Sequence, residues 1–240
     1  MNAMQTAMEN RISRRSYLDK PIDKEEQKQI IRLTEEINKV SGLSTLFVED
    51  SSAAFDSLKK SYGMFKNVRS IVVMKGKSND EHLQEKVGYY GEQLILDLTT
   101  MGLGTCWVGG TYDEQNIVNL AEGEELVCVI VIGLVEEEPT TKEKFIRAIV
   151  HRNVKHIEQR LTTDRQAPPW VLEGMEAVLL APSAIHAQNV MFKYQNETIS
   201  ASTVEKSRFD LIDLGIAKKH FELGAGGRFE WGNGMAFHKD

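Results

Sequence analysis

The chain has 240 residues, of which 41% are hydrophobic and 27% charged, and this length can bury one generous core or two small lobes. No stretch approaches the roughly 18 consecutive apolar residues of a membrane span, and the N-terminus lacks the apolar core of a secretion signal. We therefore expect a cytoplasmic protein without membrane partners. The formal net charge of -6 and the scattered basic residues argue against binding to nucleic acid.

The first 160 residues alternate between helix and strand patterns. Asp23 and Glu26 form a capping box that predicts the start of a helix, and Gly42 predicts its end. The continuous β-branched run Leu126–Leu134 indicates a strand buried on both faces. We also expect strands at Leu46–Val48, Ser70–Met74 and Thr105–Gly109, and helices at Glu81–Met101, from Asp113 towards Leu120, and from Thr140 through Val150.

The stretch Leu161–Pro169 marks the clearest boundary, because its Thr, Asp and paired prolines interrupt any helix. These patterns together predict an α+β fold of two lobes, residues 1–160 and 161–240, with helices packed on a mixed or antiparallel sheet. After the boundary we expect helices at Trp170–Leu180 and Arg208–Leu223, strands at Val190–Tyr194 and Thr198–Ser202, and a glycine-rich tail.

The two cysteines, Cys106 and Cys128, lie in apolar surroundings. They have no CxxC partner and no histidine at metal-ligand spacing, so we expect buried, reduced thiols and no metal site.

The first candidate site is the segment Arg11-Ile-Ser13-Arg-Arg15-Ser-Tyr17. In an extended backbone Arg11, Ser13 and Arg15 point to one side, where two guanidiniums and a hydroxyl can grip a phosphate. The compact cluster of Arg11, Arg14 and Arg15 also suits a single phosphate better than a polyanion. A solvated basic surface is the alternative interpretation.

The second candidate is Gly102-Leu-Gly104-Thr-Cys-Trp107-Val-Gly109-Gly110. It fails as a dinucleotide fingerprint, because its first glycines follow a helix and Trp107 stands where the third glycine belongs. It offers instead a short strand and then a glycine pair that lets backbone approach a flat ligand. A tight turn between core elements is the alternative.

The third candidate is the loop Ala181-Pro182-Ser183-Ala184-Ile-His186-Ala-Gln188-Asn189. Its small and polar residues suit a ligand clamp, and they suit a plain helix–strand connection equally well. His186 alone points to no function. Asp213 and His220, in the later helix, have no evident role, whereas Ile212, Ile216 and Phe221 fit a helix core.

Together the three segments resemble the nitroreductase family of flavoproteins. The first matches the family's R-x-S-x-R/K-x-F/Y pattern, the second its glycine-rich G-L-G-[ST]-C-W segment, and the third part of its A-P-S loop. His186 and Asn189 replace the usual Asn and Pro of that loop. The loop also lies late in the chain, which resembles a subgroup with the loop in a C-terminal half.

The resemblance implies an enzyme with FMN as cofactor and no catalytic acid, base or nucleophile. Arg11, Ser13 and Arg15 would hold the phosphate end, with Arg152 as a further cation and Lys155 as its basic neighbour. The remaining contacts implied with the flavin come from Val108, Gly109, Gly110, Pro182, Ser183 and Ala184.

The implied reaction is ping-pong hydride transfer from NAD(P)H to a nitroaromatic, quinone or flavin acceptor, which the sequence does not choose among. A flavin-binding module without turnover and a flavin-fragmenting or dehalogenating enzyme are the alternatives. The clamp and the late loop lie about 170 residues apart, and the Leu161–Pro169 connection could span roughly 20 Å or more when extended. The C-terminal lobe could therefore fold back, and we expect it to complete the site of its own chain, with a homodimer as the other possibility.

Overall fold

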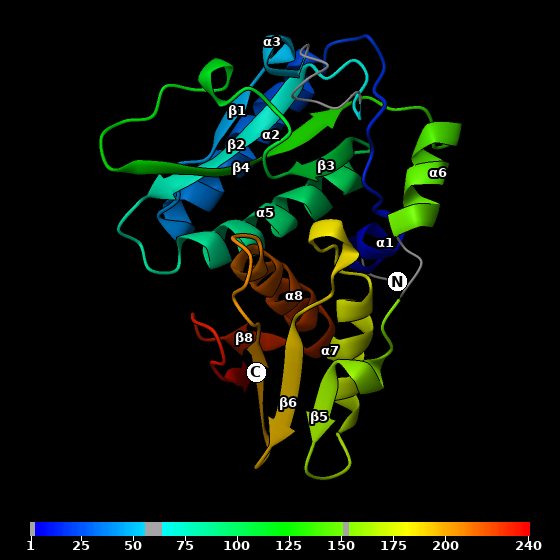
Figure 1. Cartoon of the computed structure of the whole chain (residues 1–240), viewed down its shortest axis with the longest axis vertical. Coiled ribbons are helices and arrows are strands. Elements are labelled where there is room, and N and C mark those ends of the chain that lie inside the picture. Colours follow the sequence, from blue (N-terminus) through cyan, green and yellow to red (C-terminus); the bar gives the residue numbers. More distant parts are fainter. Residues whose placement is uncertain (1–2, 56–63, 151–153) are drawn as a thin grey trace. The chain divides into compact units, whose positions relative to one another are not determined.

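Strand β4 (Glu124–Gly133) is one of the two interior strands of the larger sheet in this computed structural model, which describes residues 3–55, 64–150 and 154–240. Residues 127–133 are all buried, as the β-branched run predicts. The strand pairs antiparallel with β2 (Ser70–Lys77) and β3 (Gly104–Val108), and β1 (Leu46–Val48) joins the far edge of β2. The predicted α+β class is confirmed, and this sheet is antiparallel (Figure 1).

The chain divides into two compact units. The first comprises residues 10–83 and 94–148 and contains the larger sheet, and the second comprises residues 1–9, 84–93 and 149–240. This division differs from a split at residue 160, because the second unit also takes in residues of α1 (Ala3–Asn10) and of α5 (Leu83–Thr100). The continuous domains 1–160 and 161–240 stay a prediction.

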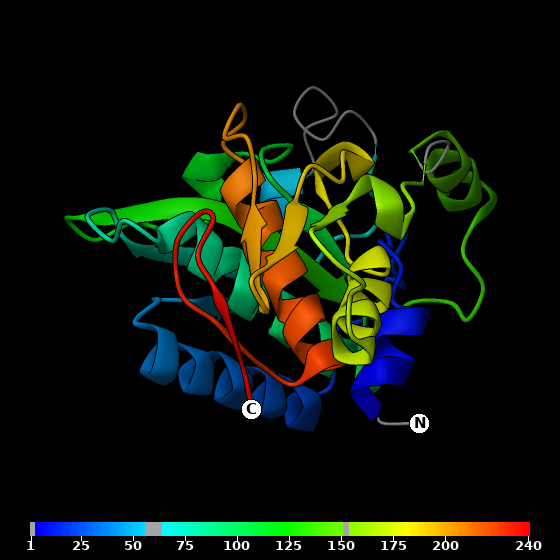
Figure 2. The same ribbon diagram turned by 90° about the horizontal axis from the view of Figure 1, so that it is seen from below.

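In the first unit, helix α2 (Lys24–Ser41) has the termini that its sequence predicts. The Asp23 carboxylate accepts the backbone N–H groups of Glu25 and Glu26, and Gly42 ends the helix with a φ of 75°. The helix contacts β1 along one face of the sheet (Figures 1 and 2). The unit also contains the short helix α3 (Ser52–Phe55).

The helix predicted from Asp113 towards Leu120 is wrong. Only a 3-10 turn, η1 (Glu114–Asn116), forms there, and Ile117 turns into the apolar core. The Asp113 side chain makes no capping bond, while its backbone N–H donates to the Ala54 carbonyl oxygen at 2.9 Å. The Asp113 backbone is thus held by a tertiary contact, and its side chain does not cap a helix.

The second unit is built on helices α7 (Pro169–Leu179) and α8 (Asp210–Ala225), which pack against each other. Beside them β5 (Leu161–Thr163) pairs parallel with β6 (Met191–Gln195), and β6 pairs antiparallel with β7 (Thr198–Ser202). The predicted boundary at Leu161–Pro169 therefore begins as a strand. The glycine-rich tail forms a further hairpin of β8 (Gly227–Phe229) and β9 (Phe237–Lys239), which the sequence did not predict.

Helix α8 is buried on nearly every side, and its buried polar side chains have partners. Lys218 Nζ lies 2.5 Å from the Glu85 carboxylate and donates to the carbonyl oxygens of Glu230 and Gly232 in the tail. His220 Nε2 lies 3.0 Å from the Glu92 carboxylate. The core positions predicted for this helix, Ile212, Ile216 and Phe221, are confirmed as buried, and His220 is a core residue as well.

Candidate functional site

The first candidate segment is extended and lies beside β3. Ser13 forms a parallel bridge with Thr105, and the Arg14 N–H donates to the Thr105 carbonyl oxygen at 2.8 Å. The buried Tyr17 hydroxyl donates to the Arg14 carbonyl oxygen, also at 2.8 Å. Side chains alternate along an extended backbone, so the Arg14 side chain points away from those of Ser13 and Arg15.

Arg14 is a structural residue. Only 5% of it is exposed, and its Nε lies 3.3 Å from Oε1 of Glu143. Its terminal nitrogens donate to the carbonyl oxygens of Glu136 at 2.8 Å and Glu138 at 3.5 Å. The prediction that Arg14 belongs to a three-arginine phosphate cluster is therefore wrong, since these acceptors hold its guanidinium inside the protein.

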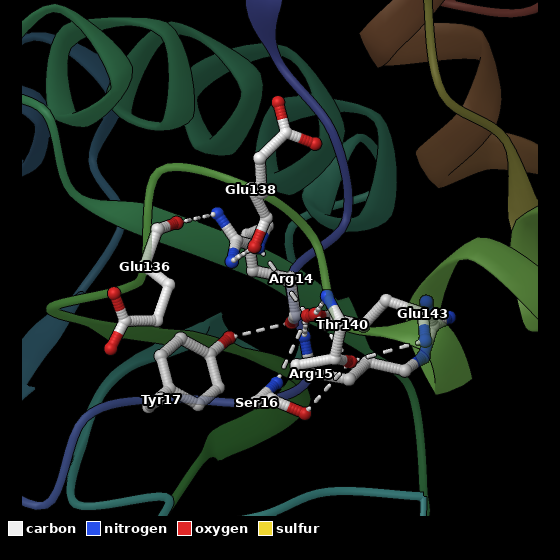
Figure 3. Close-up of polar contacts among 8 residues, drawn as sticks. All are labelled: Arg14, Arg15, Ser16, Tyr17, Glu136, Glu138, Thr140 and Glu143. Carbon is white, nitrogen blue, oxygen red and sulfur yellow. Dashed lines mark hydrogen bonds and ion pairs between the residues drawn. The ribbon is translucent and has the colours of Figure 1, made fainter.

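Glu143 anchors the backbone of the same segment (Figure 3). Its Oε1 accepts the N–H groups of Arg15 at 2.6 Å and Ser16 at 3.0 Å, and its Oε2 accepts the N–H and hydroxyl of Thr140 at 2.8 Å each. Burial raises the pKa of this carboxyl, but these hydrogen bonds outweigh it and bring the pKa to about 2. The carboxylate is thus ionised and fully used as an acceptor. The capping box predicted at Thr140 and Glu143, which begins α6 (Thr141–Val150), is confirmed.

Arg11, Ser13 and Arg15 lie near the thiol of Cys106. Ser13 hydrogen-bonds to this thiol, and although burial raises the Cys106 pKa, the guanidiniums of Arg15 and Arg11 act in the opposite direction. The Nε of Arg15 is buried and has no hydrogen-bond partner among the residues that the structure describes. The alternation of side chains has therefore brought the guanidiniums of Arg11 and Arg15 and the hydroxyl of Ser13 near the same thiol. The buried Nε–H of Arg15 still needs a hydrogen-bond acceptor.

The glycine pair follows directly after β3 in the same unit. Val108 is buried at the end of the strand, Gly109 is half-buried and Gly110 is exposed in a bend. Val108 stands three residues beyond Thr105, which corresponds to about 10 Å along a strand. The backbone beyond β3 is therefore within the length of a small ligand from the bridge at Ser13.

The A-P-S loop, residues 181–189, belongs to the other unit and follows α7. Pro182, Ser183 and Ala184 are half-buried, and a 3-10 turn, η3 (Ala184–His186), comes next. The Ser183 hydroxyl accepts the N–H of Gln188 at 3.0 Å. This bond links the start of the loop to its end.

The predicted second basic pair is only partly described. Arg152 lies outside the described residues. Lys155 is bound to the A-P-S loop, because its backbone N–H donates to Oε1 of Gln188 at 3.1 Å and its Nζ donates to the Gln188 carbonyl oxygen at 3.0 Å.

Within residues 3–55, 64–150 and 154–240 no group of His, Cys, Asp and Glu side chains is arranged to hold a metal ion. No helix in these ranges is long and apolar enough to cross a membrane. Cys106 and Cys128 are both buried free thiols, as predicted.

A family model described as "Putative TM nitroreductase" matches residues 3–225. The chain belongs to this nitroreductase family. The match ends before strand β8. A comparison with curated proteins finds no match.

Solved structures are similar to this chain to different extents. One described as a putative nitroreductase, from Thermotoga maritima, has 21% identity and a TM-score of 0.63, and the alignment covers 99% of this chain and 92% of that one. A second, described as an FMN-dependent nitroreductase from Clostridium difficile, has 20% identity and a TM-score of 0.45, with coverage of 61% of this chain and 97% of that one. The first match establishes the nitroreductase-like fold along nearly the whole chain.

The sequence did not reveal the long-range role of Glu143, nor that the buried Asp213 carboxylate accepts the N–H of Ala184. Glu143 was visible only as a helix cap, because partners more than a hundred residues away leave no local pattern. For Asp213 the one available signal was an acidic residue at a helix position otherwise suited to the core.

Proposed function

We propose that this nitroreductase-family chain is an FMN-dependent oxidoreductase that takes electrons from NADH or NADPH. The acceptor would be a nitroaromatic, a quinone or another flavin. Family membership supports the reaction class, and the residues of the first candidate segment support the cofactor.

The buried Nε of Arg15 is the observation that carries the proposal. A buried donor without an acceptor is costly, and a phosphate oxygen would satisfy it with a charge-assisted bond. The Arg15 backbone is held by Glu143, so the side chain leaves a fixed point. Arg11 and Ser13 lie near the same thiol and add a second cation and a hydroxyl, which together suit a dianionic phosphate.

FMN fits these residues better than FAD, because the segment offers a grip for one phosphate and the chain has no dinucleotide fingerprint. When bound, the flavin would accept a hydride from the nicotinamide and pass electrons to the acceptor in a ping-pong cycle. The protein would supply position and charge, with the backbone of Val108, Gly109 and Gly110 beside the ring. On the family resemblance, we assign further flavin contacts to Pro182, Ser183 and Ala184.

An anaerobic titration tests the reaction. The purified protein should be yellow and release FMN, and NADPH or NADH should bleach the flavin, whose colour should return on addition of nitrofurazone or menadione. Stoichiometric FAD, or no flavin at all, would contradict the proposed cofactor. Bound FMN that neither nucleotide bleaches would indicate a flavin-binding module without turnover.

A further inference from the structure

The A-P-S loop has a backbone that its residue types disfavour. Ile185, His186 and Gln188 have φ angles of 47°, 57° and 50°, in the left-handed region, where non-glycine residues are uncommon and a β-branched one is an outlier. Ile185 is also 90% exposed, so packing of its side chain does not compensate. Strain of this kind persists only where surrounding contacts impose it.

The contact at the start of this turn comes from α8. Both oxygens of the Asp213 carboxylate accept the N–H of Ala184, at 3.0 and 3.1 Å. Asp213 is itself 4% exposed, and α8 is packed on α7 and strand β7. The loop is therefore tied, one residue before Ile185, to a helix that is packed inside its own unit.

Buried Arg160 holds the chain on both sides of the loop. It donates to the carbonyl oxygen of Val178, before the loop, and to that of Val190, after it, at 3.3 Å each. Its charge favours the ionised form of Asp213. The tie at Ala184 and the two bonds of Arg160 thus constrain the loop from its beginning to its end.

We propose that Asp213 is a positioning residue, which imposes the left-handed turn of the A-P-S loop and so presents Pro182, Ser183 and Ala184 for flavin binding. This inference rests on the proposed function. The chemistry requires only a hydrogen-bond acceptor at Ala184, and an ionised acceptor makes the stronger bond.

Asp213 is also placed to make the loop sensitive to pH. The pKa of Asp213 is raised to about 7, mainly by burial and further by Asp210 on the same helix. The hydrogen bond from the Ala184 N–H and the charge of Arg160 act in the opposite direction. Asp210 is occupied with the N–H groups of Lys206 and Ser207. The tie to Ala184 should therefore strengthen as the pH rises through neutrality.

The first test uses the 15N-labelled chain without flavin. In the wild type, the chemical shift of the Ala184 amide should titrate with a midpoint near neutral pH. The hydrogen-exchange rate of this amide, corrected for the intrinsic effect of pH, should fall as its bond to Asp213 strengthens. Asp213→Asn should keep the fold and abolish the titration of the Ala184 amide. Asp210→Asn should leave this titration in place. An Ala184 amide that does not titrate in the wild type, or that still titrates in Asp213→Asn, would overturn the inference whether or not FMN binds.

The second test uses FMN affinity and a rescue. Asp213→Ala should weaken FMN binding about tenfold, as expected for losing a hydrogen bond to a charged group, whereas Asp213→Asn should keep most of the affinity. Adding Ile185→Gly to Asp213→Ala should restore part of the affinity, because glycine adopts the left-handed turn without help. Equal affinity in Asp213→Ala and wild type, or no rescue in the double variant, would contradict the positioning role. Failure of the wild type to bind FMN would instead contradict the proposed function.

Discussion

Oε1 of Glu143 lies 3.3 Å from Nε of Arg14 and also accepts the backbone N–H of Arg15 at 2.6 Å. One buried carboxylate thus neutralises the arginine that points inward and fixes the backbone of the arginine proposed to grip phosphate. The stability of the first unit and the shape of the clamp therefore depend on the same oxygen atom.

Replacing Glu143 should impair both properties. Glu143→Ala leaves the Arg14 guanidinium buried without its counter-ion and should lower the free energy of unfolding by about 3–5 kcal/mol. FMN binding should also weaken, since the Arg15 backbone loses its anchor. Urea unfolding and FMN titration measure the two effects. Glu138→Gln, at an exposed side chain nearby, is the matched control and should change neither. Stability equal to that of the control would contradict this role.

The protein should lose stability in acid through Glu143. Its folded-state pKa of about 2 is below the ordinary value, so its stabilisation is complete above the ordinary pKa and is lost as the pH falls towards 2. Unfolding free energies measured from pH 6 down to pH 2.5 should show a steeper decline for the wild type than for Glu143→Gln. Parallel curves for the two proteins would refute the assignment.

Asp213 should make the free energy of unfolding change with pH in the opposite direction. Its folded-state pKa of about 7 is above the ordinary value, so the folded chain holds a proton that the unfolded chain releases, and stability falls as the pH rises between about 4 and 7. A shift of this size corresponds to at most about 4 kcal/mol. Asp213→Asn should remove this slope in urea unfolding between pH 4.5 and 7.5. A wild-type slope that survives the substitution would have to come from another group.

Glycine allows the close crossing of α5 and α8 inside the second unit. A Cβ atom on Gly88 would clash with the Ile212 carbonyl oxygen, and one on Gly215 would clash with the Glu85 carbonyl oxygen. Gly→Ala normally stabilises a helix interior by about 1 kcal/mol. Here Gly88→Ala and Gly215→Ala should each destabilise by about 1–3 kcal/mol in thermal or urea unfolding, because backbone must move apart. A gain in stability would show that the helices do not cross this closely.

Local signals in the sequence were sufficient for much of the fold. Asp23 and Gly42 mark the two ends of α2 because caps act within one turn, and the apolar run of β4 identified a buried interior strand. The tail hairpin was missed because it depends on tertiary contacts, including those of Lys218 with the carbonyl oxygens of Glu230 and Gly232.

In the candidate site, too, local patterns in the sequence predicted some features and missed those that depend on distant partners. Alternation along an extended segment was enough to place Arg11, Ser13 and Arg15 near one another. It could not show that Arg14 is neutralised by Glu143, or that Asp213 ties the A-P-S loop, since those partners lie 129 and 29 residues away in sequence. Contacts between residues so far apart in sequence form only when the chain packs into its tertiary structure, and they leave no local pattern.

The central claim, that Arg11, Ser13 and Arg15 grip the phosphate of FMN, is tested most directly by comparing FMN with riboflavin, which lacks the phosphate. Dissociation constants measured by flavin fluorescence should favour FMN in the wild type. Arg15→Ala should weaken FMN binding roughly ten- to hundredfold, the value of a hydrogen bond to a charged group, and leave riboflavin binding unchanged. Equal affinity of the wild type for both flavins, or an equal loss of both in Arg15→Ala, would contradict the claim.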